Sequence, residues 1–231
     1  MESINKMKRT DANGKGKFSG TNGKRQFSTF NFQLSILLLA LLVSGCKKED
    51  SMDNPKADSF NGTVTAVVEN GAAYNSEIGT VYALYEATIN SVTGQLTGQT
   101  LGNGQFTNGG FTVSMSNIRS ESLKDIQTFF SSLLEISAAL EYSNPDARLL
   151  DADFYAITSG GNYLDYFIYT TTGSKRTVCL FVYVDSDATV KGKNVSVALL
   201  QGWNRIYWTP ADKKVVSKAP GGMKWYFNNE Q

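Results

Sequence analysis

Apolar and polar residues alternate with a period of two along most of the chain beyond its first quarter, a pattern that indicates β-strands with one buried face. Runs rich in β-branched and aromatic residues predict strands at 60–68, 78–87 and 108–115. The Gly-, Thr- and Gln-rich stretch 94–104 is predicted as a hairpin region.

A second group of strands is expected in the C-terminal part of the chain. The run Val178 to Val184 is apolar on both faces, which predicts a central strand covered on both sides. Glycine-rich or polar turns separate the runs. The predicted strands are 149–158, 164–171, 175–184, 195–200, 203–209 and 224–228.

Between these two groups the apolar residues follow a helical spacing. From Leu123 to Leu134 they recur at intervals of three and four residues. Ser122 and Asp125 match the S-x-x-[DE] pattern of a helix N-terminus. We expect one helix around residues 122–136, packed on a sheet through its apolar stripe; docking to a partner helix is the alternative.

These elements predict a mainly β protein, built as one or more antiparallel β-sandwiches with one inserted helix. The 21 glycines and four prolines suit strands joined by glycine turns. The expected order is a β region at 60–118, a helix and connection at 119–146, and a second β-sheet region at 147–231. The two β regions form one continuous domain or two.

A different pattern occupies residues 34–43, which are apolar without interruption. This run is shorter than the roughly 20 residues that a membrane-spanning helix needs. It follows a basic segment, an arrangement typical of a secretory signal peptide. We expect residues 1–45 to be that peptide, starting at Met1 or at Met7.

The apolar run ends in the segment 42–46, LVSGC, which resembles the lipobox of bacterial lipoproteins. The resemblance implies cleavage between Gly45 and Cys46, a diacylglycerol on the Cys46 thiol and acylation of the new amine. The membrane would then be a partner through this lipid anchor, at the outer membrane. Several acyl chains on one residue give stable anchoring.

The segment that follows Cys46 is expected to be a flexible acidic tether, residues 46–59. Its start at 47–50, KKED, resembles the acidic export signal of surface lipoproteins in Gram-negative gut bacteria. That resemblance implies exposure at the cell surface. The alternative is a solvated spacer.

The charge balance changes once the signal peptide is set aside. The whole chain has 22 Lys and Arg against 21 Asp and Glu, and the first 45 residues hold seven of the former and two of the latter. The remaining 15 basic and 19 acidic residues give a formal charge of −4. A mildly acidic domain is a poor nucleic-acid binder, so no nucleic-acid partner is expected.

The first β region resembles the carboxypeptidase-regulatory-like or transthyretin-like β-sandwich over residues 60–116. The matching motifs are NGTV, ENG, GTVYALY and NGGFTVSM. The resemblance implies a transthyretin- or immunoglobulin-like sandwich with a non-catalytic accessory role. The chain departs from that family where it becomes helical. More loosely, its C-terminal Trp-containing segments resemble uncharacterised surface lipoproteins of gut bacteria.

The residue types present exclude several kinds of active site. The chain has no histidine, which excludes a Ser-His-Asp triad and histidine-based metal centres. Cys179 lacks a histidine base and is expected in the core. No G-K-[ST] phosphate loop occurs. We therefore expect no enzymatic activity, no catalytic residues, no metal and no cofactor.

Two pairs of acidic residues are alternative candidates for a functional site. Asp151 and Asp153 are two apart on one predicted strand, so their carboxylates could act together in a glycosidase; a solvated strand face is the plainer interpretation. Asp185 and Asp187 could bind calcium, but a polar hairpin explains them equally well.

Aromatic residues near polar neighbours provide candidates for glycan binding. A sugar stacks on a flat exposed ring, and hydrogen-bonding side chains beside the ring fix its orientation. The alternative is that these rings belong to the core. The candidate residues are Tyr163, Trp203, Trp208 and Trp225, with Tyr166 and Tyr169 as further members.

The sequence therefore predicts a non-enzymatic, lipid-anchored lipoprotein of the cell envelope. It would act as a binding accessory for glycans or other extracellular polymers. The alternative is a structural, adhesin-like or protein-interaction module that uses an edge strand. A glycoside hydrolase is the third alternative.

Replacement of Cys46 tests the lipid anchor. Cys46→Ala should abolish incorporation of labelled fatty acid and release the protein from the membrane fraction, because the acylated thiol is removed. Cys179→Ala is the matched control and should leave labelling unchanged. Labelling retained in Cys46→Ala would refute the assignment.

Overall fold

The computed structural model describes residues 55–90, 93, 95–134 and 139–227. The predicted lipidation and cleavage residues, Cys46 and Gly45, lie outside these described residues. By its internal contacts, Asp50–Gln231 forms one compact unit.

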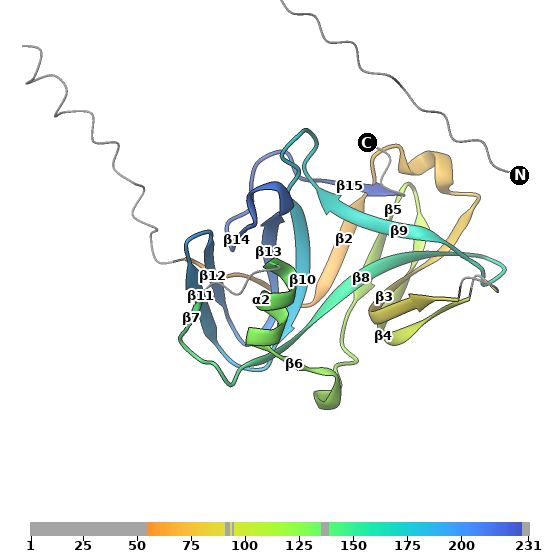
Figure 1. Ribbon diagram of the computed structural model, residues 1–231. Helices are drawn as coiled ribbons and strands as arrows, with labels where there is room; N and C mark the ends of the chain where they lie inside the picture. Colours follow the sequence, from red (N-terminus) through yellow and green to blue (C-terminus); the bar gives the residue numbers. More distant parts are fainter. Residues whose placement is uncertain (1–54, 91–92, 94, 135–138, 228–231) are drawn as a thin grey trace, which may run out of the picture. The chain divides into compact units, whose positions relative to one another are not determined.

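The fold is mainly β, as predicted, with one α-helix among the described residues (Figure 1). Almost all strand pairs are antiparallel; β12 and β14 run parallel. The strands are β1 (Asp58–Phe60), β2 (Thr63–Val67), β3 (Ile78–Ile89), β4 (Leu96–Thr107), β5 (Gly110–Ser114), β6 (Lys124–Asp125), β7 (Glu141–Tyr142), β8 (Arg148–Thr158), β9 (Tyr163–Thr170), β10 (Val178–Val184), β11 (Ala188–Gly192), β12 (Val195–Leu199), β13 (Gly202–Thr209), β14 (Lys214–Val216) and β15 (Lys224–Phe227), and the helix is α2 (Ile126–Leu134).

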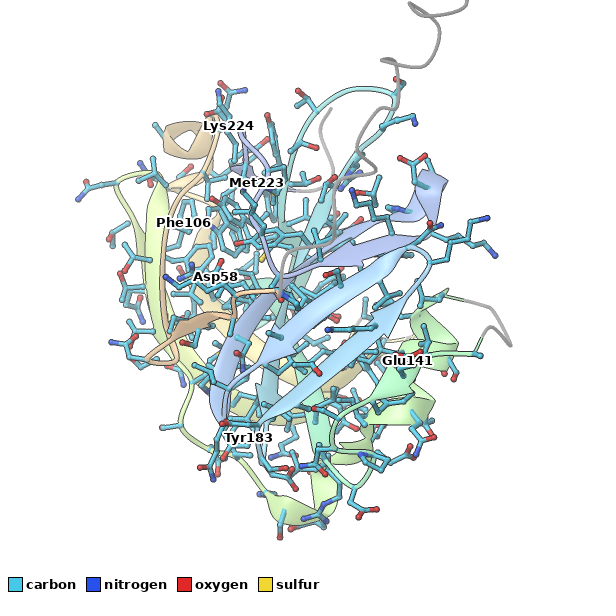
Figure 2. All side chains as sticks on the ribbon, turned by 90° about the vertical axis from the view of Figure 1, so that its left-hand side faces the viewer. Asp58, Phe106, Glu141, Tyr183, Met223 and Lys224 are labelled. Atoms are coloured by element: carbon cyan, nitrogen blue, oxygen red, sulfur yellow. The ribbon has the colours of Figure 1, made fainter. Side chains whose placement is uncertain are left out.

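Seven of the described strands form a ring around the larger hydrophobic core. Hydrogen-bonded neighbours follow the order β2-β5-β4-β3-β8-β9, and β15 pairs with β9. The ring closes where Val68 bridges Trp225, and the Glu69 N–H donates to the Trp225 carbonyl at 2.8 Å. Side chains fill the space between the strands (Figure 2). Phe111 and Phe154 pack against the ring of Trp225 at this core's centre.

The second core lies under helix α2. The remaining sheet runs from β8 through β10, β13, β14, β12 and β11 to β7. Helix α2 buries Ile126, Phe130 and Leu134, which are four residues apart and therefore share one face. They cluster with apolar residues such as Leu149 and Val182. The predicted packing of the helix on a sheet is thus confirmed.

Strand β10 is a central strand, as the sequence predicts. It pairs with β13 on one side and with β8 and β9 on the other. Cys179 and Phe181 belong to the first core, whereas Val182 and Val184 belong to the second. Both faces of the strand are therefore covered by apolar side chains.

The first strand of the described chain, β1, is fixed to β13 by charge as well as by pairing. Asp58 lies opposite Arg205, and its Oδ1 is 3.1 Å from Arg205 Nη1. The Tyr207 hydroxyl donates to Asp58 Oδ2 at 2.5 Å. The Arg205 guanidinium also lies over the Phe60 ring, 4.7 Å from its centroid. Asp58, labelled in Figure 2, therefore fixes β1 to β13.

The helix starts later than the sequence predicts. The helix begins at Ile126 because Asp125, and not Ser122, caps it: Asp125 Oδ1 accepts the Thr128 N–H at 2.9 Å. Ser122 ends a short 3₁₀ turn instead. The end predicted at residue 136 lies outside the described residues. The stretch 94–104, predicted as a hairpin region, lies mostly in the long strand β4, which is the second arm of the antiparallel hairpin formed by β3 and β4.

Two glycines explain why β4 is a strand despite its composition. Strand β4 pairs with β3 and then turns to pair with β5. A Cβ at Gly102 would lie 2.1 Å from the Ser114 carbonyl oxygen, and one at Gly104 would lie 1.9 Å from that of Thr112. Only glycine permits this approach of two backbones at the corner.

Alanine at Gly104 should therefore destabilise the ring. We expect the free energy of unfolding to fall by ~3 kcal/mol and Tm to fall by roughly 10 °C, because the added methyl group forces the backbones apart. Gly221→Ala is the matched control: no atom lies within 4 Å of its Cβ, so Tm should stay nearly unchanged. Thermal unfolding followed by circular dichroism measures both. Equal effects of the two substitutions would contradict the close-approach argument.

Candidate functional site

Two of the predicted glycan-binding residues, Trp203 and Trp225, lie in the first core. Each side chain is only 6% exposed. Trp203 packs against Phe60 and donates its Nε1–H to the Met115 carbonyl at 3.2 Å. Trp225 stacks on Phe181, with centroids 5.6 Å apart. Neither ring offers a face to a sugar, so this part of the prediction is wrong.

The other two, Trp208 and Tyr163, are half-buried but lie apart. Trp208, on β13, packs against the second core. It lies opposite Val178 of β10, which in turn lies opposite Thr170 of β9. Tyr163 begins β9, seven residues before Thr170, which is about 20 Å along an extended strand. The structure therefore does not combine them into one platform. Tyr169, the further member on β9, stacks on Trp225 and packs against the first core.

Tyr163 instead joins a group of tyrosines on one face of β3, β8 and β9. Tyr82 lies directly opposite Tyr155, and Tyr155 lies directly opposite Tyr166. Neighbouring strands are ~4.8 Å apart, so this row spans roughly 10 Å. The rings of Tyr155 and Tyr163 are 6.2 Å apart at an angle of 55°. We call these four half-buried residues the tyrosine face.

The alternation of β8 determines which side chains reach this face. Leu150, Ala152 and Phe154 point into the first core. The residues between them, Asp151 and Asp153, therefore point to the opposite side, which they share with Tyr155. Sequence reasoning missed Tyr82 and Tyr155 because the register that aligns them involves residues far apart in the chain.

Among the carboxylates beside the tyrosine face, Asp153 has the pKa that departs furthest from its ordinary value. Burial and then the negative charge of Asp151 raise its pKa to about 6, while a hydrogen bond from Tyr155 acts in the other direction. Asp153 is exposed to solvent although many protein atoms surround it, so water screens part of this effect. Burial also raises the pKa of Asp151, against the nearby Lys124 charge.

Two of the four tyrosine hydroxyls lie beside carboxylates. Burial, and then the charge of Asp153, raise the pKa of Tyr155. Burial and the charge of Asp165 raise that of Tyr163 to about 12, and the Tyr163 hydroxyl lies 3.5 Å from Asp165 Oδ1. Both hydroxyls thus stay protonated at neutral pH. The face combines aromatic rings with hydrogen-bonding oxygens.

The other candidate sites have structural partners. Asp185 accepts hydrogen bonds from the Arg148 N–H at 2.9 Å and the Arg148 Nε–H at 3.1 Å, and Asp187 accepts one from the Gln201 N–H at 2.7 Å. Both carboxylates therefore stabilise turns. Cys179 is buried, and burial raises the pKa of its thiol. Within the described ranges, no group of three His, Cys, Asp or Glu residues is placed to hold a metal.

The comparisons with known proteins add no relative. No family model matches the chain, and no curated protein or solved structure is significantly similar to it. The resemblance to transthyretin-like sandwiches stays a prediction. In the part of the chain that the structure describes, no helix is long and apolar enough to cross a membrane.

The raised pKa of Asp153 makes the stability depend on pH. Between about pH 4 and 6 the folded protein holds a proton on Asp153 that the unfolded chain has lost, so this group's contribution to the unfolding free energy falls as pH rises through that window. Asp153→Asn removes the effect. After allowance for solvent screening, we expect the free energy of unfolding of the variant to be ~1 kcal/mol higher than that of the wild type at pH 7. At pH 4 the two free energies should be almost equal.

Urea unfolding of both proteins at several pH values measures this difference. A difference that is constant across the range would contradict the raised pKa. A variant that is less stable than the wild type at pH 7 would show that the Tyr155 hydrogen bond outweighs the cost of the charge.

Proposed function

We propose that this protein is a lipid-anchored binding module of a bacterial cell envelope and that it binds a glycan on its tyrosine face. The observation that carries the proposal is the row Tyr82–Tyr155–Tyr166, which lies across three paired strands. No catalytic role is assigned to these residues.

The row has the properties that sugar binding requires. Aromatic rings provide apolar surface for the C–H faces of a sugar, and the hydroxyls and carboxylates beside them bind its hydroxyl groups. Strands hold such side chains more rigidly than loops do, so less conformational entropy is lost on binding. The row's length of roughly 10 Å suits a short oligosaccharide.

The lipid anchor fits this role. Cys46 precedes Asp58, the first residue of β1, by 12 residues. Such a tether reaches at most ~40 Å when fully extended. The Asp58–Arg205 ion pair at the end of the tether then holds the domain's entry point in place. The domain would bind polymers near the membrane surface.

Protein interaction is a second candidate, supported by one observation. Val67 on β2 is 81% exposed, more than any other large apolar side chain among the described residues. Its neighbours on the same outer face include Thr65 and Thr112, whose hydroxyl oxygens lie 3.2 Å apart. An outer β surface that exposes apolar and hydroxyl side chains can pack against another protein.

A pull-down with insoluble polysaccharides and a glycan array test the proposal on the soluble chain from Asp53 onward. Tyr155→Ala should weaken binding about tenfold, because a central ring of the row is lost. Tyr142→Ala, which removes a half-buried tyrosine from β7 in the second core, is the matched control and should leave binding unchanged.

Three other outcomes have distinct meanings. Absence of binding to every glycan would refute the proposal. Capture of a surface protein that is lost in Val67→Asp would favour the second candidate. Release of reducing sugar, abolished by Asp151→Asn or Asp153→Asn, would indicate the hydrolase that the carboxylate pair permits.

A further inference from the structure

Two carboxylates lie beside the tyrosine face: Asp153 next to Tyr155, and Asp165 next to the Tyr163 hydroxyl. In the described parts of the chain, neither Asp153 nor Asp165 forms an ion pair. The nearby cation, Lys124, is engaged by Glu86, whose Oε1 lies 2.8 Å from Lys124 Nζ. Negative charge therefore remains uncompensated beside the rings.

Two of the four hydroxyl groups of the face are oriented by these carboxylates. The contacts between Tyr155 and Asp153 and between Tyr163 and Asp165 use the hydroxyl protons as donors to the carboxylates. The hydroxyl lone pairs and the other carboxylate oxygens remain as acceptors. Around Tyr155 and Tyr163 the face thus presents mainly acceptors, and the ligand group that fits best there is one that donates several hydrogen bonds.

We propose that the tyrosine face selects glycans that carry a protonated amine, which are amino sugars without an N-acetyl group, over neutral and acidic glycans. An ammonium group offers three donors and no acceptor, which complements the carboxylates and hydroxyl oxygens. The negative faces of the tyrosine rings attract the same charge. The proposal rests on the proposed function and specifies its ligand.

The net charge of the protein favours the same ligand. The chain after the predicted signal peptide has a formal charge of −4, which raises the local concentration of cationic polymers. An acidic sugar would instead meet Asp153 and Asp165 and find Lys124 already paired. Repulsion of this kind gives specificity, because it disfavours the wrong ligand directly.

Calorimetric titration with four defined trisaccharides tests the selection. The probes are β-1,4-linked glucosamine, N-acetylglucosamine, glucose and glucuronic acid, added to the soluble chain from Asp53 onward at pH 6.5. We expect the glucosamine trimer to bind at least tenfold more tightly than the two neutral trimers, and the glucuronic acid trimer not to bind.

Two variants separate this site from general charge attraction. Asp153→Asn should remove most of the tenfold preference, measured within the variant as the ratio of its affinities for the glucosamine and glucose trimers. Asp212→Asn removes the same charge from a carboxylate that is paired with Lys175, away from the face, and should keep the preference. Circular dichroism and Tm confirm that both variants are folded.

The outcomes distinguish this inference from the proposed function. Equal binding of the glucose and glucosamine trimers would overturn the selection for amines and leave glycan binding intact. Binding of no trimer and no polysaccharide would overturn both. Glucosamine binding that persists in both Tyr155→Ala and Asp153→Asn would show charge attraction elsewhere, and would also overturn the inference.

Discussion

The alternation of side chains along β8 is the constraint on which the rest of the structure depends. Its inward residues, such as Phe154, build the first core, and Leu149 on the opposite side belongs to the second. Because consecutive side chains point to opposite faces, a shift of one residue would move both sets at once. The same alternation brings Asp153 and Tyr155 to the outer face. Both cores and the candidate site therefore depend on one register.

Closure of the ring provides the second constraint. The strand edges that would otherwise be open meet where Val68 bridges Trp225. This contact places the Trp225 ring among Phe111, Phe154 and Phe181, so the chain's C-terminal strand completes a core that its first strands begin. Such closure also needs a tight corner in β4, which its alternating glycines allow.

The candidate site differs from the core in how its aromatic rings are used. In the core, rings contact other rings, and the Nε1–H of Trp203 is satisfied by a backbone carbonyl. On the tyrosine face, the rings have carboxylates as neighbours, and these carboxylates have no basic partner among the described residues. Negative charge that is crowded by protein atoms and has no counter-ion lowers stability, and such a cost is commonly associated with binding sites.

The sequence by itself determined the local features of this protein. Period-two alternation predicted most strands, and helical spacing predicted α2, because both patterns arise from neighbouring residues. The proposed lipid chemistry at Cys46 likewise depends only on a short contiguous motif. The tertiary structure decided which face of each strand is covered. Trp203 and Tyr155 are both aromatic residues in alternating strands, yet one is core and the other faces outward. That difference depends on register and ring closure between residues far apart in the chain, and no local pattern encodes such contacts.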